Sequence, residues 1–424
     1  MINYTRGKVD NRNGVGIFNV GPGEIAIAGF IFTTIFFSDG HAFHSVSRIA
    51  IVGVFLIEFL SGKKLHFNPF LCTALVFVAL SAASLAWTAA PESSSARVGT
   101  LAYQLISYIA LINLVSWRKN RLDLCLTWIV ISALAAGSYV VLIQGITFQD
   151  DRSMVGVISA GQLALACAAG VMVAVFRFSE TRRSRYLLAI AILSVFLLFT
   201  SSRRGLLLIL FFLAIFYFFG AKGPGRRFLS FIGGIIMFSV AYALVIRVPV
   251  LYEFVGQRLE AFVSFLLLDA TGDASVQGRS SLVDFSFRLF QDSPYLGHGV
   301  DSFRVLFSQR HGSWYTSADN NYLELLAGLG ILGFFAYYIP YLIFVIKGLH
   351  GVTTKSRAVH FALAAVLSMA VIDFATVWIY SRVGLVFLVL CYQVVYRESR
   401  LVSESLGTPA VTPDSGSAIR RAAH

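Results

Sequence analysis

Two adjacent arginines stand in an otherwise apolar stretch of the chain. The segment "LLFTSSRRGLLLILFF" runs from 197 to 212 and places Arg203 and Arg204 at its centre. Charged groups in such surroundings are costly and often functional. The planar guanidinium group of arginine can bind two phosphate oxygens at once, which the ammonium group of lysine cannot. The pair therefore indicates either an anchor at a membrane interface or a binding site for a phosphate-bearing ligand.

A third arginine belongs to a long segment between apolar runs, from about 247 to 319. Arg279 comes before a helical pattern of apolar residues that extends from about 280 to 291. We expect Arg279 at the start of a helix, where free backbone N–H groups also favour an anion. Together with Arg203 it would bind an anion at the membrane surface, most simply a lipid pyrophosphate, and stabilise negative charge there.

If a group is transferred from such a lipid to a hydroxyl group, a side chain must orient or deprotonate the acceptor. Our candidate for this base is Asp319, which stands in "ADNNYL" directly before an apolar run. The alternative is that Asp319 caps the helix starting near Asn320, a position that suits aspartate. His311 and Glu324 are weaker candidates for a catalytic role. We also assign Asn320, Tyr322 and His311 to substrate binding.

The composition indicates an integral membrane protein. Of the 424 residues 57% are hydrophobic and only 13% are charged, whereas soluble domains have about 45–50% apolar and about 25% charged residues. Long runs of Leu, Ile, Phe and Ala favour helices over the alternating strands of a barrel. We attribute the net charge of +12 to cytoplasmic loops in a lipid bilayer and not to nucleic-acid binding. No acidic pair or histidine cluster has metal-ligand spacing, so we expect no metal or other cofactor.

The apolar runs predict an all-α fold with about twelve membrane-spanning helices, since a helix needs about 20 apolar residues to cross a bilayer. One long loop is expected between spans nine and ten, and the polar C-terminal tail is expected to be disordered. The spans are predicted at about 22–38, 46–61, 68–88, 99–116, 122–145, 155–176, 186–201, 204–220, 228–246, 320–346, 358–379 and 382–396. The corresponding regions are 1–246 for the first nine spans, 247–319 for the loop, 320–396 for the last three spans and 397–424 for the tail.

The distribution of lysine and arginine predicts the orientation. With both termini in the cytoplasm, every lysine of the chain falls in an inner segment, as the positive-inside rule requires. Arg203, Arg204 and the arginines of loop 247–319 then lie on the outer face. We therefore expect any reaction at these arginines to take place on the outer side of the membrane.

Three motifs in chain order resemble the O-antigen ligase and O-antigen (exopolysaccharide) polymerase superfamily, which are glycosyltransferases of the bacterial inner membrane. The motifs are "TSSRRGLLL", "GRSSLVDFSFRLFQDSPYLGHGVDSF" and "ADNNYLELLAGLGILGFF". The resemblance implies a periplasmic reaction with an undecaprenyl-pyrophosphate-linked glycan as the donor. Polymerases of the family transfer the glycan to another lipid-linked repeat, and ligases transfer it to lipid A–core. Arg203 and Arg279, with Arg204 less favoured, would bind the donor pyrophosphate.

One departure from the motifs bears on which reaction is expected. The ligase pattern has a His-Asn pair where this chain has Asp319 and Asn320. We therefore predict a polymerase of O-antigen or exopolysaccharide repeats, with a ligase as the alternative and a chain-length regulator as a candidate partner. A flippase for the same lipid carrier is a further alternative. Asp373, an ionisable residue within a predicted span, is the feature that best suits a transporter.

Overall fold

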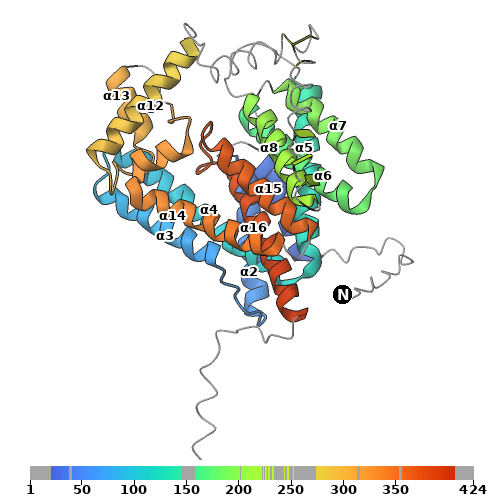
Figure 1. Ribbon diagram of the computed structural model, residues 1–424. Helices are drawn as coiled ribbons and strands as arrows, with labels where there is room; N and C mark the ends of the chain where they lie inside the picture. The colour runs from blue at the N-terminus through green and yellow to red at the C-terminus, as the bar shows by residue number, and fades with distance from the viewer. Residues whose placement is uncertain are drawn as a thin grey trace, which may run out of the picture.

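The computed structural model describes residues 21–37, 41–144, 158–200, 202–221, 274–312, 316–352 and 356–405, with isolated positions between 223 and 252. Of some helical residues, Arg203 and Arg279 among them, it describes the backbone only. Throughout the described ranges the regular elements are helices, which confirms the expected all-α class. Figure 1 shows the whole arrangement.

The helices begin where local signals favour a start. Proline occupies the first turn of α1, α3 and α4, where its missing N–H group costs nothing. Asn68 and Ser159 cap α3 and α6 by accepting hydrogen bonds from backbone N–H groups. The bounds are α1 Pro22–Phe36, α2 Ala42–Leu60, α3 Pro69–Ala83, η1 Ser84–Ala86, α4 Pro91–Trp117, α5 Lys119–Tyr139, η2 Val140–Gln144, α6 Ala160–Thr181, α7 Ser184–Phe199, α8 Arg203–Gly220, α12 Ala274–Asp292, α13 Phe303–His311, α14 Asn321–Val352, α15 Arg357–Ile372 and α16 Arg382–Ser405.

Six of the described helices are long and apolar enough to cross a membrane. They lie at Ala42–Leu60, Pro69–Ala86, Pro91–Trp117, Lys119–Ile143, Ala160–Thr181 and Asn321–Leu349. Four shorter apolar helices are Pro22–Phe36, Ser184–Phe199, Arg204–Gly220 and Arg357–Ile372. The chain is therefore a multi-pass membrane protein, but the predicted count of about twelve spans is not confirmed. A helix occupies each predicted span except 228–246, most of which lies outside the described residues.

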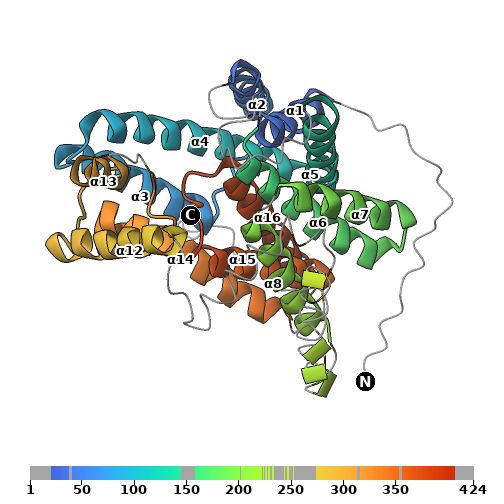
Figure 2. The same ribbon diagram turned by 90° about the horizontal axis from the view of Figure 1, so that it is seen from above.

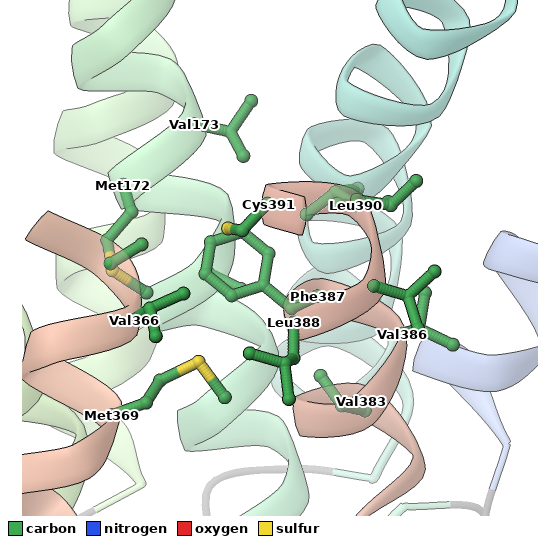
Figure 3. Close-up of a cluster of buried hydrophobic side chains, with 14 of the residues drawn as sticks. Met172, Val173, Val366, Met369, Val383, Val386, Phe387, Leu388, Leu390 and Cys391 are labelled. Atoms are coloured by element: carbon green, nitrogen blue, oxygen red, sulfur yellow. The ribbon is translucent and has the colours of Figure 1, made fainter. Parts of the chain in front are cut away.

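The helices form two groups around a buried centre. In Figures 1 and 2, α3, α4 and α14 lie on one side and α5 to α8 on the other, with α15 and α16 between them. Helix α16 lies deep in the bundle. Its Phe387, 3% exposed, lies among Met172 of α6 and Val366 and Met369 of α15, as Figure 3 shows. Close apolar packing of this kind holds the bundle together where the surroundings are themselves apolar.

Three boundaries differ from those predicted. Helix α15 ends at Ile372, so Asp373 stands at a helix end and not within a span; residues 373–381 form an irregular segment, the α15–α16 turn. Helix α16 continues to Ser405 into the tail predicted to start at 397, because glycine and proline first occur at 407 and 409. Helix α12 begins at Ala274, before the predicted start near 280.

Helix α14 is broken at Gly330, within the span predicted as one helix. Gly330 has φ 62° and ψ −162°, a conformation that only glycine adopts readily. Four backbone hydrogen bonds of 2.8–3.4 Å join both sides of the break to the loop between α12 and α13, residues 293–302. They run from the N–H groups of His298, Gly299, Ile331 and Leu332 to the carbonyl groups of Ala327, Gly328, Pro294 and Tyr295, respectively.

The break therefore leaves these backbone groups paired. In a regular helix Ile331 and Leu332 would donate to Ala327 and Gly328, four residues earlier. Here the two N–H groups donate to carbonyl groups of the α12–α13 loop instead, and the two carbonyl groups accept from N–H groups of that loop. Irregular backbone at membrane depth is tolerated only where protein groups satisfy it in this way.

We expect Gly330→Ala to disrupt this junction. A Cβ atom at Gly330 would lie 2.4 Å from the carbonyl carbon and oxygen of Tyr295, in a backbone region that penalises side chains. The free energy of unfolding should fall by more than about 2 kcal/mol in denaturant titrations of the purified protein. Gly53→Ala in α2 is the control, since its Cβ atom would meet nothing within 4 Å. Equal stability of the two variants would contradict the assignment.

A buried ion cluster ties α1, α2 and α5 together. Arg121 of α5 is 1% exposed, and its Nε lies 2.8 Å from Oε1 of Glu24 while its Nη2 contacts Oε1 of Glu58. Arg118, which is 53% exposed, also reaches Glu24, at 3.1 Å. Lys63 lies 2.5 Å from Oε2 of Glu58, so each carboxylate has a second cation and the buried Arg121 connects the two.

Arg121→Ala and Arg118→Ala therefore form a matched pair. Removing Arg121 leaves two carboxylates without their buried partner, a loss of about 3–5 kcal/mol in the free energy of unfolding. Removing Arg118 breaks an exposed pair and should cost about 1 kcal/mol or less. Thermal unfolding in detergent measures both, and similar costs would show that the cluster does not hold these helices.

Candidate functional site

Arg204 joins three separate segments of the chain. It lies in the first turn of α8, and its Nη2 is 3.1 Å from Oδ1 of Asp319. Its Nη1 donates a hydrogen bond of 3.2 Å to Oγ1 of Thr376 in the α15–α16 turn. The side chains of Arg204 and Asp319 are each 34% exposed, so a ligand can reach the ion pair. The fold thus brings together an arginine and an aspartate from two motifs that are far apart in the sequence.

Asp319 has an unusual backbone and does not cap α14. Its φ of 53° is left-handed, a conformation that aspartate tolerates better than most residues. The cap is Asn320, whose Oδ1 accepts hydrogen bonds from the N–H groups of Tyr322 and Leu323 at 2.9 and 3.1 Å. The alternative prediction, that Asp319 caps this helix, is therefore wrong, because the cap is the next residue, Asn320. The Asp319 carboxylate is directed to Arg204 instead.

Glu324 holds the segment before α14 in place. It is 3% exposed, and its Oε2 accepts a hydrogen bond of 2.9 Å from the N–H group of Ala318. This contact reaches back across the start of the helix, as the glutamate of a capping box does. Asn320 and Glu324 together fix the backbone on both sides of Asp319.

A buried hydrogen-bond knot fastens the start of α14 to the α15–α16 turn. Asn321 is fully buried, and its N–H group donates to the carbonyl group of Asp373 at 2.8 Å. Its Oδ1 accepts from the N–H groups of Trp378 and Ile379, both at 3.1 Å. Its Nδ2 donates to the hydroxyl group of Tyr338, which in turn donates to Oδ2 of Asp373 at 2.7 Å. The knot sets the position of Thr376 relative to Asp319.

Sequence reasoning overlooked Asn321. The doubled asparagine directly before an apolar run was the available signal, because a polar residue entering a buried helix must find hydrogen-bond partners. Asp373 is the residue that best suits a transporter by sequence. In the structure it contacts Asn321 and Tyr338 and is part of the hydrogen-bond knot.

The two arginines most favoured by the resemblance are described only in part. Arg203 is the first residue of α8, next to Arg204, and Arg279 lies in the second turn of α12. The expected position of Arg279 at a helix start is therefore wrong, because the helix begins at Ala274. Their side chains lie outside the described part of the chain, so their convergence stays a prediction.

Tyr322 and His311 have packing partners in the structure. The hydroxyl group of Tyr322 donates to the carbonyl group of Ala370 at 2.6 Å, and its ring stacks on that of Tyr338 at 4.8 Å. His311 ends α13 and stacks on Phe307, with ring centroids 4.2 Å apart. Tyr322 thus ties α14 to α15, and substrate binding by either ring stays a prediction.

A second charged cluster surrounds Asp301 in the α12–α13 loop. Asp301 is 2% exposed and accepts a hydrogen bond of 2.7 Å from Oγ of Ser93. Nη2 of Arg97 lies 3.4 Å from Oδ1 of Asp301, and Arg304 contacts Oδ2. The guanidinium group of Arg97 lies 4.0 Å from the ring centroid of Tyr380. The cluster fastens the start of α4 to this loop and to the α15–α16 turn.

Residues 187–338 match the family model described as O-Antigen ligase. The resemblance to the O-antigen ligase and polymerase superfamily is confirmed. No curated protein was found to match the chain. The matching segment, which we name the O-antigen ligase segment after that model, begins in α7 and ends at Tyr338, so it contains Arg204, Asp319 and Asn321. The family is one of glycosyltransferase-like enzymes.

Asn321→Ala and Asn320→Ala test the start of α14 in the O-antigen ligase segment. Loss of Asn321 leaves the buried N–H groups of Trp378 and Ile379 without partners, so the free energy of unfolding should fall by about 2–5 kcal/mol. Loss of the Asn320 cap should cost about 1 kcal/mol. Denaturant titration of both purified variants measures the difference, and a larger effect at Asn320 would contradict the knot.

Proposed function

We propose that this protein polymerises undecaprenyl-pyrophosphate-linked oligosaccharide repeats on the periplasmic face of the inner membrane. The observation that carries the proposal is the Arg204–Asp319 ion pair within the O-antigen ligase segment. It provides a phosphate-binding cation and a carboxylate at one accessible place. Both termini would be cytoplasmic, as the lysine distribution predicts.

The proposed reaction uses the two charges for different substrates. Arg204, with Arg203 and Arg279, would bind the pyrophosphate group of the donor and stabilise its charge as the bond from sugar C1 to oxygen breaks. Asp319 would accept the proton of the acceptor hydroxyl group as that oxygen bonds to C1. In this proposal the guanidinium groups supply the positive charge, and no metal takes part.

Without substrate, Arg204 and Asp319 neutralise each other at 3.1 Å. A pyrophosphate group carries more negative charge than one carboxylate, so it would compete for the guanidinium group. Binding of the donor would then release the Asp319 carboxylate beside the reacting carbon. The base would become available only when a donor is present.

A ligase is the second candidate, because the family model itself is described as O-Antigen ligase. Asp319, where the ligase pattern has histidine, favours the polymerase. The argument for a flippase is weaker, since the contacts of Asp373 with Asn321 and Tyr338 suit a structural role.

Asp319→Asn tests the proposed base. Asparagine keeps a side-chain oxygen for Arg204 but cannot accept a proton, so elongation should fall by about 10²–10⁴-fold. Purified protein and a lipid-linked repeat unit provide the assay, with product length read by electrophoresis. Asp123→Asn, which neutralises a carboxylate that is 54% exposed and pairs with Arg177 away from the site, is the control and should retain activity. Full elongation by Asp319→Asn would exclude this role.

The cellular product separates the polymerase from the ligase. Cells without the protein should lack long glycan on the lipid carrier. If they accumulate long glycan on the carrier but fail to attach it to lipid A–core, the ligase alternative is correct.

A further inference from the structure

A largely apolar pocket lies between α3, α4, α14 and α16. Its cavity volume is about 60 Å³ and part of it is open to the outside, which is room for a short stretch of a chain and not for a whole small-molecule ligand. Phe70 and Phe77 of α3, Leu101 of α4 and Leu388 of α16 contribute to its wall. Such a lining suits a hydrocarbon chain.

The pocket also contains a polar atom that the described residues leave without a partner. Gln104 of α4 is 3% exposed, and its Oε1 has no hydrogen-bond partner among them. Buried amide oxygens are normally satisfied. A water molecule or a polar group of a bound ligand would complete this site.

A cation stands beyond one end of the pocket. Arg97, Leu101 and Gln104 recur along α4 at helical spacing and therefore share one face of the helix. Arg97 is four residues closer than Leu101 to the start of α4, and its side chain is 19% exposed. Its Nε has no hydrogen-bond partner among the described residues. The same helix face thus leads from an apolar pocket to a guanidinium group that is partly exposed.

The pocket adjoins the Arg204 site across the α15–α16 turn. Ile379 lines the pocket while its N–H group donates to Asn321. The same turn offers Thr376 to Arg204 and Tyr380 to Arg97. One short segment, residues 376–380, therefore contacts both arginines.

We propose that this pocket holds part of the isoprenoid chain of a second lipid-linked glycan, the acceptor, with its phosphate group against Arg97. The proposal rests on the proposed function, because elongation needs two lipid-linked glycans at once. The donor phosphate would lie at Arg204 and the acceptor phosphate at Arg97. The glycans would meet above the α15–α16 turn, where Asp319 is located.

Photo-crosslinking tests the pocket without any transfer reaction. Full-length protein in nanodiscs of phosphatidylethanolamine and phosphatidylglycerol is mixed with a polyprenyl phosphate that carries a diazirine on its chain. We expect labelled peptides from the helices that line the pocket, α3, α4, α14 and α16. Ala336→Trp, which places an indole in the pocket wall, should reduce this labelling about tenfold or more. Leu342→Trp on the same helix is the control, since Leu342 is 59% exposed and should not affect labelling.

Three results would overturn the pocket. They are label only on helices other than α3, α4, α14 and α16, label unchanged by Ala336→Trp, or equal label from a diazirine-bearing phosphatidylglycerol that polyprenyl phosphate does not displace. The last would identify an ordinary bilayer lipid. If the protein elongates the glycan but the label lies outside the pocket, the pocket assignment is overturned and the proposed function stands. If the label lies in the pocket but the protein does not elongate the glycan, the proposed function and the acceptor role are overturned. Binding of the isoprenoid chain in the pocket then stands.

Arg97→Gln tests the phosphate contact. Binding of polyprenyl phosphate should weaken about tenfold or more, because a charge-assisted hydrogen bond is lost. Binding of the uncharged polyprenol should stay within about twofold, and Arg97→Lys should restore part of the affinity for the phosphate. Equal loss for the phosphate and the alcohol would show that Arg97 only supports the pocket, which would overturn the head-group assignment.

Discussion

The exchange of backbone hydrogen bonds between the α12–α13 loop and the broken helix α14 is the constraint on which the rest of the structure depends. The break at Gly330 frees two carbonyl groups and two N–H groups, and the loop binds all four. Neither partner is stable alone, because unpaired backbone groups cost several kcal/mol each away from water. The loop thereby places Asp301 beside Arg97, while the short first part of α14 carries Asn320 and its neighbours to the Arg204 site.

Polar groups act as fasteners in a bundle whose apolar surfaces give little specificity. Within a membrane the hydrophobic effect does not distinguish a neighbouring helix from lipid, so packing and hydrogen bonds must do so. Three such fasteners join segments distant in sequence: Arg121 at α1, α2 and α5, Asn321 at the α15–α16 turn, and Asp301 at α4. Two of them border the candidate site. The site therefore occupies the place where helix positions are fixed by directed bonds.

The sequence was sufficient for the features set by composition and short motifs. Apolar run length located the helices, because membrane depth dictates it. The motifs contained both Arg204 and Asp319, although the resemblance favoured Arg203 over Arg204. Local propensity could not choose the cap within "DNN", since aspartate and asparagine cap equally well. It also could not reveal the break at Gly330 or the roles of Asn321 and Asp373. Those depend on backbone groups of the α12–α13 loop and the α15–α16 turn, and only the folded chain brings them near.

The Arg204–Asp319 pair has a property that a two-substrate reaction requires, because its charges neutralise each other until a ligand takes one of them. Under the proposed function, the donor pyrophosphate would take the guanidinium group and repel the released carboxylate. The carboxylate would then turn toward the acceptor hydroxyl group, which has a proton to give. Its backbone cannot follow freely, since the hydrogen bonds of Ala318 and Asn320 to α14 hold Asp319 on both sides. In this proposal the order of events, donor first and base second, would follow from the two charges that α8 and the segment before α14 bring together.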